Sequence, residues 1–386
     1  MTFFRLQIAP LLFLVGIFFL NYLSRIILAP LMPTIEKDLK VGHDEAGSFF
    51  LLIALGFCIG LLVSGFISSR LNHRRTIILS SMAVGGTLLV VSVSHSLSGI
   101  RFGLIVLGMA AGLYFPSGIA TLTNLVNPEH WGKAIAIHEL APNFAFVVAP
   151  LLAEALSGVC SWRGVLALLG IVSIIVGTVF VLFGKGGTFP GEAPNVGILR
   201  TMLVNPTFWI MIALFTLGNG SSFGVYTMMP LYLVAEKGMD RAWVNTLIAF
   251  SRISTMVASI LVGWVSDRIG TKKTLTGIFI ANGIFTLLLG LAPQSWIVVI
   301  VFLQPVFAAS FFTPGLTALS QMGSQRIKNV AVSLTIPVGF LLGGGGTAAW
   351  IGIMGEKESF SLGIALFGGL LFGGVILTRF LKFSKD

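Results

Sequence analysis

Four ionisable side chains lie inside long apolar stretches, and their chemistry is the first clue to function: Arg25, His138, Glu139 and Arg252. An ionisable group in hydrocarbon costs several kcal/mol, from about 2.5 upward, so each one needs a charged partner, a water-filled cavity or a function. A guanidinium group binds carboxylates and phosphates through a planar fork of donors. A carboxyl group or an imidazole can take up and release a proton. These residues point to anion binding and proton exchange.

Arg252 is the deepest of these residues. It precedes Asp267 by fifteen residues, and that separation is about 22 Å along a helix, which corresponds to the middle of a membrane. We expect Arg252 to anchor a carboxylate or a phosphate. The alternative is a structural salt bridge, for example to Glu139.

Arg25 ends the run Asn21-Tyr22-Leu23-Ser24-Arg25, in which Asn21 lies one helical turn earlier on the same face. We expect Asn21, Tyr22 and Arg25 to bind substrate together. The alternative for Arg25 is a side chain that extends to the outer lipid headgroups.

Glu139 and His138 are the expected proton-coupling residues. Burial favours the neutral carboxyl and a nearby arginine favours the charged one, so Glu139 can load a proton when substrate occupies the arginine. His138 can relay that proton, or it can be a neutral imidazole that bonds a backbone carbonyl. Asn143 follows Glu139 by four residues and can hold the carboxyl or the substrate. A permanent brace between Glu139 and an arginine is the alternative.

Three further polar side chains complete the expected substrate-binding set: Asn219, Tyr226 and Gln304. Tyr226 lies near the repeat-related counterpart of Arg25 and can act as an uncharged donor. Simple packing is the alternative, because the chain is rich in aromatic residues.

The composition places these residues in a membrane protein. Of the 386 residues, 55% are hydrophobic and only 10% are charged, whereas soluble domains have about 25% charged residues. Twelve spans of about 20 to 24 residues would use roughly 240 to 290 residues. Twelve apolar runs lie at about 8–32, 46–68, 75–95, 99–125, 133–158, 162–183, 206–234, 243–266, 273–291, 295–320, 328–355 and 359–381.

A glycine- and proline-rich segment, 184–206, separates the two sets of six runs and predicts a linker. We therefore expect an all-α integral membrane protein with six-helix bundles at 1–183 and 207–386. With both termini in the cytoplasm, fifteen Lys and Arg residues lie on the cytoplasmic side and seven on the other. That asymmetry predicts a multi-pass inner-membrane protein, and it explains the net charge of +10 without nucleic acid.

The two halves repeat each other. GFISSRLNHRR at 65–75 corresponds to GWVSDRIGTKK at 263–273, and the same offset of 198 residues carries Pro116 onto Pro314. Two structural copies are common in secondary transporters. At the offset of 198 the counterpart of Arg252 is Ala54, and at an offset of 195, which aligns KAIAIHELAP with KNVAVSLTIP, Glu139 and His138 correspond to Leu334 and Ser333. A residue that only one copy has is not required by the fold, so these residues are candidates for function.

GWVSDRIGTKK resembles the signature loop between helices 8 and 9 of the major facilitator superfamily, and its degenerate twin lies between helices 2 and 3. The resemblance implies alternating access, with Asp267 and Arg268 bracing neighbouring helix ends as a gate. In the first copy Ser69 replaces the acid and Asn72 replaces the glycine. The gating residues expected from the motif are Gly65, Arg70, Arg74, Gly263, Asp267, Arg268 and Gly270.

The run from Asn21 to Arg25 resembles the Asn-Tyr-x-Asp-Arg pattern of helix 1 in organic anion transporters of the anion:cation symporter family. The resemblance implies that Arg25 faces a central cavity and binds an anion. Ser24 stands where that family usually has aspartate, so a proton-binding role at this position is missing.

Two arginines against one acid disfavour a cation as substrate. We expect a secondary transporter, and no enzyme, that moves a small organic anion, such as lactate or a sugar acid, together with protons. Exchange of organic anions or organophosphates is the alternative, followed by drug efflux and by a sensing role without transport. The Gly343–Gly346 run lacks the Gly-Lys-Ser/Thr ending of a phosphate loop. We expect no cofactor and no metal, and a monomer in the lipid bilayer.

Overall fold

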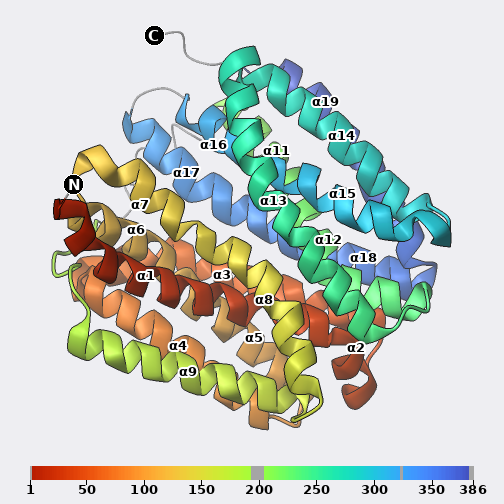
Figure 1. Cartoon of the computed structure of the whole chain (residues 1–386), viewed down its shortest axis with the longest axis horizontal. Coiled ribbons are helices and arrows are strands. Elements are labelled where there is room, and N and C mark those ends of the chain that lie inside the picture. The colour runs from red at the N-terminus through yellow and green to blue at the C-terminus, as the bar shows by residue number, and fades with distance from the viewer. Residues whose placement is uncertain (1, 193–203, 322–324, 382–386) are drawn as a thin grey trace. The chain divides into compact units, whose positions relative to one another are not determined.

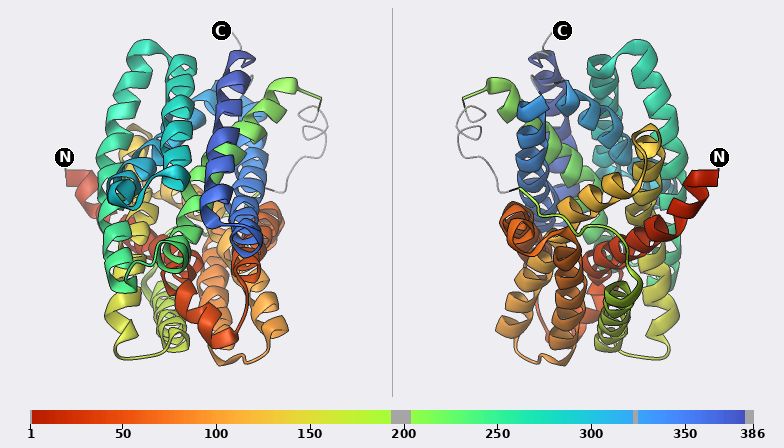
Figure 2. Two further views of the ribbon diagram at one scale, coloured as in Figure 1. Left: turned by 90° about the vertical axis from the view of Figure 1, so that its right-hand side faces the viewer. Right: turned by 90° about the vertical axis from the view of Figure 1, so that its left-hand side faces the viewer.

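The computed structural model describes residues 2–192, 204–321 and 325–381. Twelve segments among them are long and apolar enough to cross a membrane. Each corresponds to one of the twelve predicted runs, and the elements drawn in Figure 2 are helices and loops. The predicted all-helical membrane fold is confirmed.

Six spans come from the first half of the chain, and several of them consist of more than one helix (Figure 1). Their helices are α1 (Thr2–Ile26), α2 (Leu28–Leu39), α3 (His43–Leu71), α4 (His73–Val93), α5 (Leu97–Gly112), α6 (Tyr114–Leu125), η1 (Pro128–His130), α7 (Trp131–His138), α8 (Leu140–Ser157) and α9 (Trp162–Phe183).

The other six spans contain three π-helical segments, at η2, η3 and η5. Their helices are α11 (Pro206–Asn219), η2 (Gly220–Gly224), α12 (Val225–Leu231), η3 (Tyr232–Glu236), α13 (Arg241–Ile269), α14 (Thr271–Leu291), η4 (Gln294–Trp296), α15 (Ile297–Ser310), α16 (Phe312–Ser320), α17 (Gln325–Gly339), η5 (Phe340–Gly345), α18 (Gly346–Lys357) and α19 (Phe360–Arg379).

The repeat seen in the sequence also appears as matching helix interruptions. The fourth span breaks at Leu113 and the tenth span at Phe311, which are 198 residues apart. Each break precedes a proline, Pro116 or Pro314, that cannot donate a hydrogen bond to the carbonyl four residues earlier. The proline therefore interrupts the backbone ladder at the same place in both copies.

The fifth span has an interruption that its counterpart lacks. The α7 helix ends at His138, Glu139 adopts a turn, and α8 begins at Leu140. Pro142 cannot donate to the carbonyl of His138, so the helix lacks one backbone hydrogen bond at this turn. The counterpart proline, Pro337, lies inside the continuous helix α17.

Contacts group the chain into two compact units, and each is described separately below. The first unit contains Met1–Leu31 and Leu52–Pro194, and the second contains Met32–Leu51 and Asn195–Asp386. Inside the second unit, the backbone N–H of His43 donates to Glu356 at 2.8 Å, and a Cβ on Gly47 would lie 2.6 Å from the carbonyl oxygen of Ala348. The predicted boundaries at 183 and 207 follow the chain order and remain a prediction.

The start of the predicted linker lies against the first unit. The backbone N–H groups of His73 and Arg74 donate to the carbonyls of Phe189 and Gly187 at 3.2 and 2.7 Å. These bonds satisfy donors in the first turn of α4 that have no partner within their own helix. The rest of the linker, from 193 to 203, lies outside the described residues.

Candidate functional site

Arg25 lies at the end of α1 with only 2% of its surface exposed. Its guanidinium carbon is 4.5 Å from the centre of the Tyr22 ring and 4.1 Å from the centre of the Phe57 ring. Aromatic faces attract a guanidinium, and stacking on two rings fixes the plane of its N–H donors. A guanidinium can bind an oxyanion through two parallel N–H donors at its edge.

The neighbours of Arg25 in the predicted binding set hold α1 in place. The amide of the buried Asn21 donates to the carbonyl of Ala111 at 3.1 Å and to the hydroxyl of Ser80 at 3.4 Å. The hydroxyl of Ser24 donates to the carbonyl of Asn21 at 2.8 Å, within the helix. Asn21 therefore connects α1 to α4 and α5, and this explains how Tyr22 and Arg25 are positioned.

His138 and Glu139 form a close pair at the interruption of the fifth span. The Nδ1 atom of His138 is 3.3 Å from a carboxylate oxygen of Glu139, and the histidine is fully buried while the Glu139 side chain is 46% exposed. The imidazole stacks on Phe18 with ring centres 4.3 Å apart. Asn143 donates its side-chain amide to the backbone carbonyl of Glu139 at 3.0 Å. Asn143 therefore supports the turn instead of the carboxyl group.

Tyr114 completes this cluster, and the sequence reasoning missed it. Its hydroxyl donates to the carbonyl of Leu14 at 2.7 Å and lies 3.1 Å from Nε2 of His138. Tyr114 belongs to the buried core of the first unit together with Leu14 and Phe18. A signal was present, because Tyr114 is a polar aromatic residue directly after the helix break and just before Pro116. Phe57 was also missed, since nothing distinguishes it from the other phenylalanines in the sequence.

Arg252 is the corresponding buried arginine of the second unit, 2% exposed on α13. Its guanidinium carbon is 4.4 Å from the centre of the Tyr226 ring, and Nη2 donates to the carbonyl of Ser222 at 3.3 Å. Ser222 belongs to the π-helix η2, where the widened turn changes the backbone hydrogen bonding. The predicted pair of Arg252 and Tyr226 is thus in contact within one unit.

The other predicted polar residues of the second unit, Asn219 and Gln304, donate hydrogen bonds to groups on helices. Asn219 donates to the carbonyl of Phe215 at 2.8 Å. The fully buried Gln304 donates to the carbonyl of Ser221 at 3.1 Å and to the hydroxyl of Thr286 at 3.2 Å. Gln304 therefore connects α15 to η2 and α14, and it helps to hold the segment that carries Ser222.

The two copies of the gating motif adopt the same backbone conformation at their turns. Gly270 has φ 89° and ψ 148°, and Asn72 has φ 72° and ψ 164°. Glycine adopts this conformation without strain, whereas asparagine does not. The side chain of Asn72 accepts a hydrogen bond from the N–H of Arg75 at 2.9 Å and so caps α4.

Two arginines of the motif copies contact a backbone carbonyl and an aromatic ring. Arg74 donates to the carbonyl of Val181 at 3.1 Å, and the guanidinium of Arg268 lies 3.8 Å from the ring centre of Trp264. Asp267 is exposed and has no ion-pair partner among the side chains that the structure describes. Gly65 and Arg70 lie in α3, and Gly263 lies in α13. The gating role of these residues remains a prediction.

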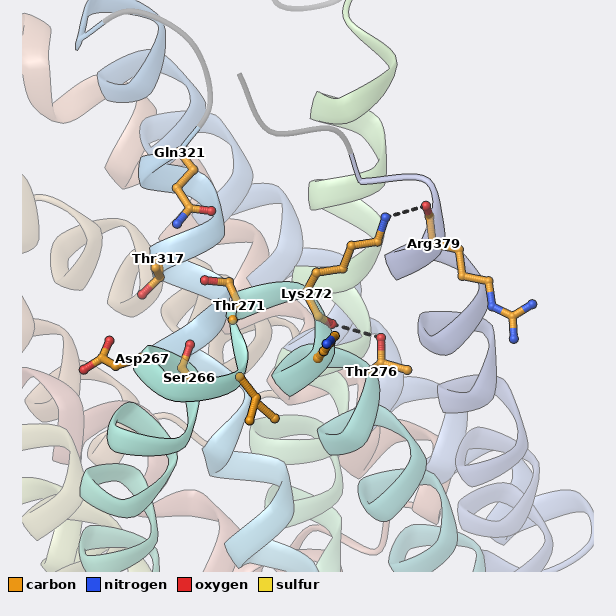
Figure 3. A pocket seen from close by; sticks show the side chains of 11 residues that line it. Ser266, Asp267, Thr271, Lys272, Thr276, Thr317, Gln321 and Arg379 are labelled. Atoms are coloured by element: carbon orange, nitrogen blue, oxygen red, sulfur yellow. Dashed lines mark hydrogen bonds between the residues drawn. The ribbon is translucent and has the colours of Figure 1, made fainter. Parts of the chain in front are cut away.

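A hollow of about 920 Å³ lies beside the second copy of the motif (Figure 3). Lys272 extends along it and donates to the carbonyl oxygens of Arg379 and Leu381 at 2.7 and 3.3 Å. These are carbonyls at the end of α19, which an ammonium group stabilises. Lys272 is therefore a structural link between α14 and α19.

The described residues contain no group of three or more His, Cys, Asp or Glu side chains that could hold a metal ion. The candidate site therefore rests on the buried Arg25 and Arg252 and on the contacts among Tyr114, His138 and Glu139.

Comparisons with known proteins agree with this fold. The model of the Major Facilitator Superfamily matches residues 14–326. The uncharacterized MFS-type transporter YceJ of Bacillus subtilis is 22% identical over 80% of each chain. An MFS-type efflux pump of Mycolicibacterium smegmatis is 23% identical over 91% of this chain and 85% of its own. The hexuronate transporter of Bacillus subtilis is 22% identical over 72% of this chain and 68% of its own.

A solved structure shows the same fold. It is a bacterial homolog to the human lysosomal transporter Spinster, in an inward-facing and occupied conformation, with a TM-score of 0.76. The alignment covers 96% of this chain and 94% of that chain at 15% sequence identity. Since the family model spans more than half of the sequence, the chain belongs to the major facilitator superfamily of membrane transporters.

Proposed function

We propose that this transporter carries a small organic anion, of the sugar-acid or monocarboxylate type, together with protons. The observation that supports it most is a buried arginine in each unit whose guanidinium lies against aromatic rings: Arg25 against Tyr22 and Phe57, and Arg252 against Tyr226. Ionisable side chains inside a membrane-spanning bundle commonly mark substrate pathways, and a guanidinium is suited to bind an anionic substrate.

The chemistry of the substrate follows from the shape of these donors. A carboxylate accepts two parallel hydrogen bonds from one guanidinium, and this geometry selects it over a neutral solute. The similarity to a hexuronate transporter favours a sugar acid, whose hydroxyl groups would add hydrogen bonds that lactate cannot make. The mechanism we propose is alternating access with one carboxylate held by Arg252 or Arg25.

Proton coupling is assigned to Glu139 and His138. The sequence-based hypothesis was that a proton on Glu139 releases an arginine for the substrate. In the described residues the ion-pair partner of Glu139 is His138. We therefore propose that the proton binds within the His138–Glu139 pair, and that the link to Arg25 passes through α1, because Phe18 on that helix stacks on His138.

Anion exchange and drug efflux are the competing functions. Two arginines can bind two negative charges, as an organophosphate exchanger would require, and the similarity to an efflux pump supports the second alternative. Exchange predicts counterflow of labelled anion that is independent of pH. Efflux predicts that hydrophobic compounds, and not acids, stabilise the purified protein.

The decisive experiment measures lumenal pH in proteoliposomes that contain a pH-sensitive dye. A panel of hexuronates, aldonates, monocarboxylates, dicarboxylates and organophosphates is added outside at equal concentration. We expect acidification with sugar acids or monocarboxylates, and its loss in Arg25→Gln, Arg252→Gln and Glu139→Gln. Glu154→Gln is the matched control, since Glu154 lies on the same span as Glu139 but outside the pair. The proposal would be refuted if no compound of the panel acidified the lumen, or if acidification were unchanged in all three variants.

A further inference from the structure

We propose that Tyr114 is a positioning residue that fixes the tautomer of His138, so that the His138–Glu139 pair binds one shared proton and separates when this proton leaves. The inference deepens the proposed proton coupling and rests on it for its consequence in transport. The tautomer itself can be measured without any transport.

The hydroxyl of Tyr114 determines which ring nitrogen carries hydrogen. It has one hydrogen, and the carbonyl of Leu14, 2.7 Å away, can only accept, so the hydrogen must lie in that contact. The hydroxyl oxygen is also 3.1 Å from Nε2 of His138 and must accept there. Nε2 is therefore protonated. Both side chains are fully buried.

The consequence appears at Nδ1. A neutral imidazole carries one N–H, so hydrogen on Nε2 leaves a lone pair on Nδ1. Nδ1 faces Oε1 of Glu139 at 3.3 Å. Without a further proton, two acceptors would oppose each other. With one proton between them, either a carboxylic acid donates to the imidazole or an imidazolium donates to the carboxylate. The observed contact therefore corresponds to a pair that holds one proton.

Loss of the proton must open the contact, and the two partners differ in freedom. His138 is held by the stacked ring of Phe18 and by Tyr114. The Glu139 side chain is 46% exposed and lies at the turn between α7 and α8. Glu139 is thus the movable partner, and its carboxylate can turn toward the exposed side. The break of the fifth span is where proton release would change the structure.

The other charged groups that the structure describes on the elements around the pair lie at a distance along those elements. On α1, Arg25 follows Phe18 by seven residues, about 10 Å along a helix. On α7, the exposed Lys133 precedes His138 by five residues. Glu154 and Arg163 lie near the far ends of α8 and α9. Tyr114 is in direct contact with the pair, through its hydroxyl at Nε2 of His138.

The first test observes the tautomer directly by nitrogen NMR of the full-length protein in nanodiscs, labelled with ¹⁵N-histidine. The chain has five histidines, and His138→Gln identifies the signals of His138. We expect Nε2 to carry hydrogen at every pH, with only Nδ1 responding to pH. A neutral imidazole with its hydrogen on Nδ1 would overturn the proposal, whatever the transport assays show.

The second test removes the hydroxyl with Tyr114→Phe. Neutral His138 can then move its hydrogen to Nδ1 and bond the carboxylate of Glu139 without taking up a proton. This hydrogen bond stabilises the pair that has lost its proton. A hydrogen bond to a charged group contributes enough free energy to lower proton affinity at least about tenfold. Half-maximal uptake should therefore need an external pH about one unit lower. The NMR signal should show the exchanged tautomer.

The matched control is Tyr232→Phe. Tyr232 is also fully buried and also donates to a backbone carbonyl, that of Leu289, at 2.7 Å. The control loses the same kind of bond and should leave the pH profile unchanged. An unchanged profile and tautomer in Tyr114→Phe would overturn the proposal. If that variant does not fold, the tautomer of the unmodified protein still decides. If the protein moves no protons but shows the expected tautomer, only the proposed function fails.

Discussion

Replacing Arg25 by lysine keeps the charge of the residue and removes its planar fork of donors. A carboxylate held by two parallel bonds to a guanidinium would keep one bond to an ammonium group. One hydrogen bond to a charged group contributes about 1.5 to 3 kcal/mol, so we expect binding of the anion to weaken about 10- to 150-fold. The same variant weakens stacking on Tyr22 and Phe57, which lie 4.5 and 4.1 Å from the guanidinium carbon.

The stability effect must be separated from the binding effect, and Arg163→Lys provides the comparison. Arg163 stacks on Trp162 at 4.1 Å and donates to the carbonyl of Ser94 at 3.2 Å, so it makes a similar set of contacts outside the site. Stacking of this kind contributes about 0.5 to 2 kcal/mol per ring. We therefore expect both variants to lower the unfolding midpoint, with the larger effect at Arg25, and only Arg25→Lys to lose affinity.

The assay is isothermal titration of the purified, detergent-solubilised protein with the anion that acidifies proteoliposomes, together with thermal unfolding of both variants. Anion affinity in Arg25→Lys equal to that of the unmodified protein would show that the fork does not bind the substrate. Equal loss of affinity in Arg163→Lys would show that the effect is one of general stability. Either result refutes the assignment of Arg25.

The remaining predictions concern stability and are measured by thermal unfolding. Gly343→Ala should destabilise by about 1 to 3 kcal/mol, because its Cβ would lie 2.1 Å from the carbonyl oxygen of Thr216. Gly346→Ala is the control, with its nearest neighbour 3.6 Å away. Asn72→Gly should stabilise by about 1 kcal/mol, since relief of backbone strain exceeds the few tenths lost with the cap. Lys272→Met should destabilise by about 1 kcal/mol by removing its bonds to the end of α19. An unchanged midpoint in Gly343→Ala, Asn72→Gly or Lys272→Met would contradict the corresponding contact, whereas Gly346→Ala should leave the midpoint unchanged.

The helices and their repeat could be predicted from the sequence because each has a local cause. Apolar runs of about twenty residues specify spans, and Pro116 and Pro314 each remove one backbone hydrogen bond at the same place in the two copies. The turn at Gly270 could also be anticipated, since the motif needs a positive φ there. Asn72 shows that the same turn forms even without glycine.

The partners of the functional residues could not be predicted, since they depend on tertiary contacts. Glu139 was expected to pair with an arginine, whereas the ion-pair partner of its carboxylate among the described residues is His138. The contact depends on the rotamers of both side chains, which periodicity does not specify. The π-helix that offers the carbonyl of Ser222 to Arg252 has no local sequence signature either. The contact of Arg25 with Phe57 could not be predicted either, because the sequence does not show which of the many aromatic rings lies beside Arg25.

The repeat separates what the fold requires from what the chemistry requires. Features that serve the backbone recur in both copies, namely the breaks at Leu113 and Phe311 and the turns at Asn72 and Gly270. The pair of His138 and Glu139 does not recur, because Ser333 and Leu334 replace it within the continuous helix α17. A transporter that couples one proton to one anion needs only one proton site. Unequal copies are therefore consistent with the proposed mechanism, in which the first unit exchanges the proton and Arg25 or Arg252 binds the anion.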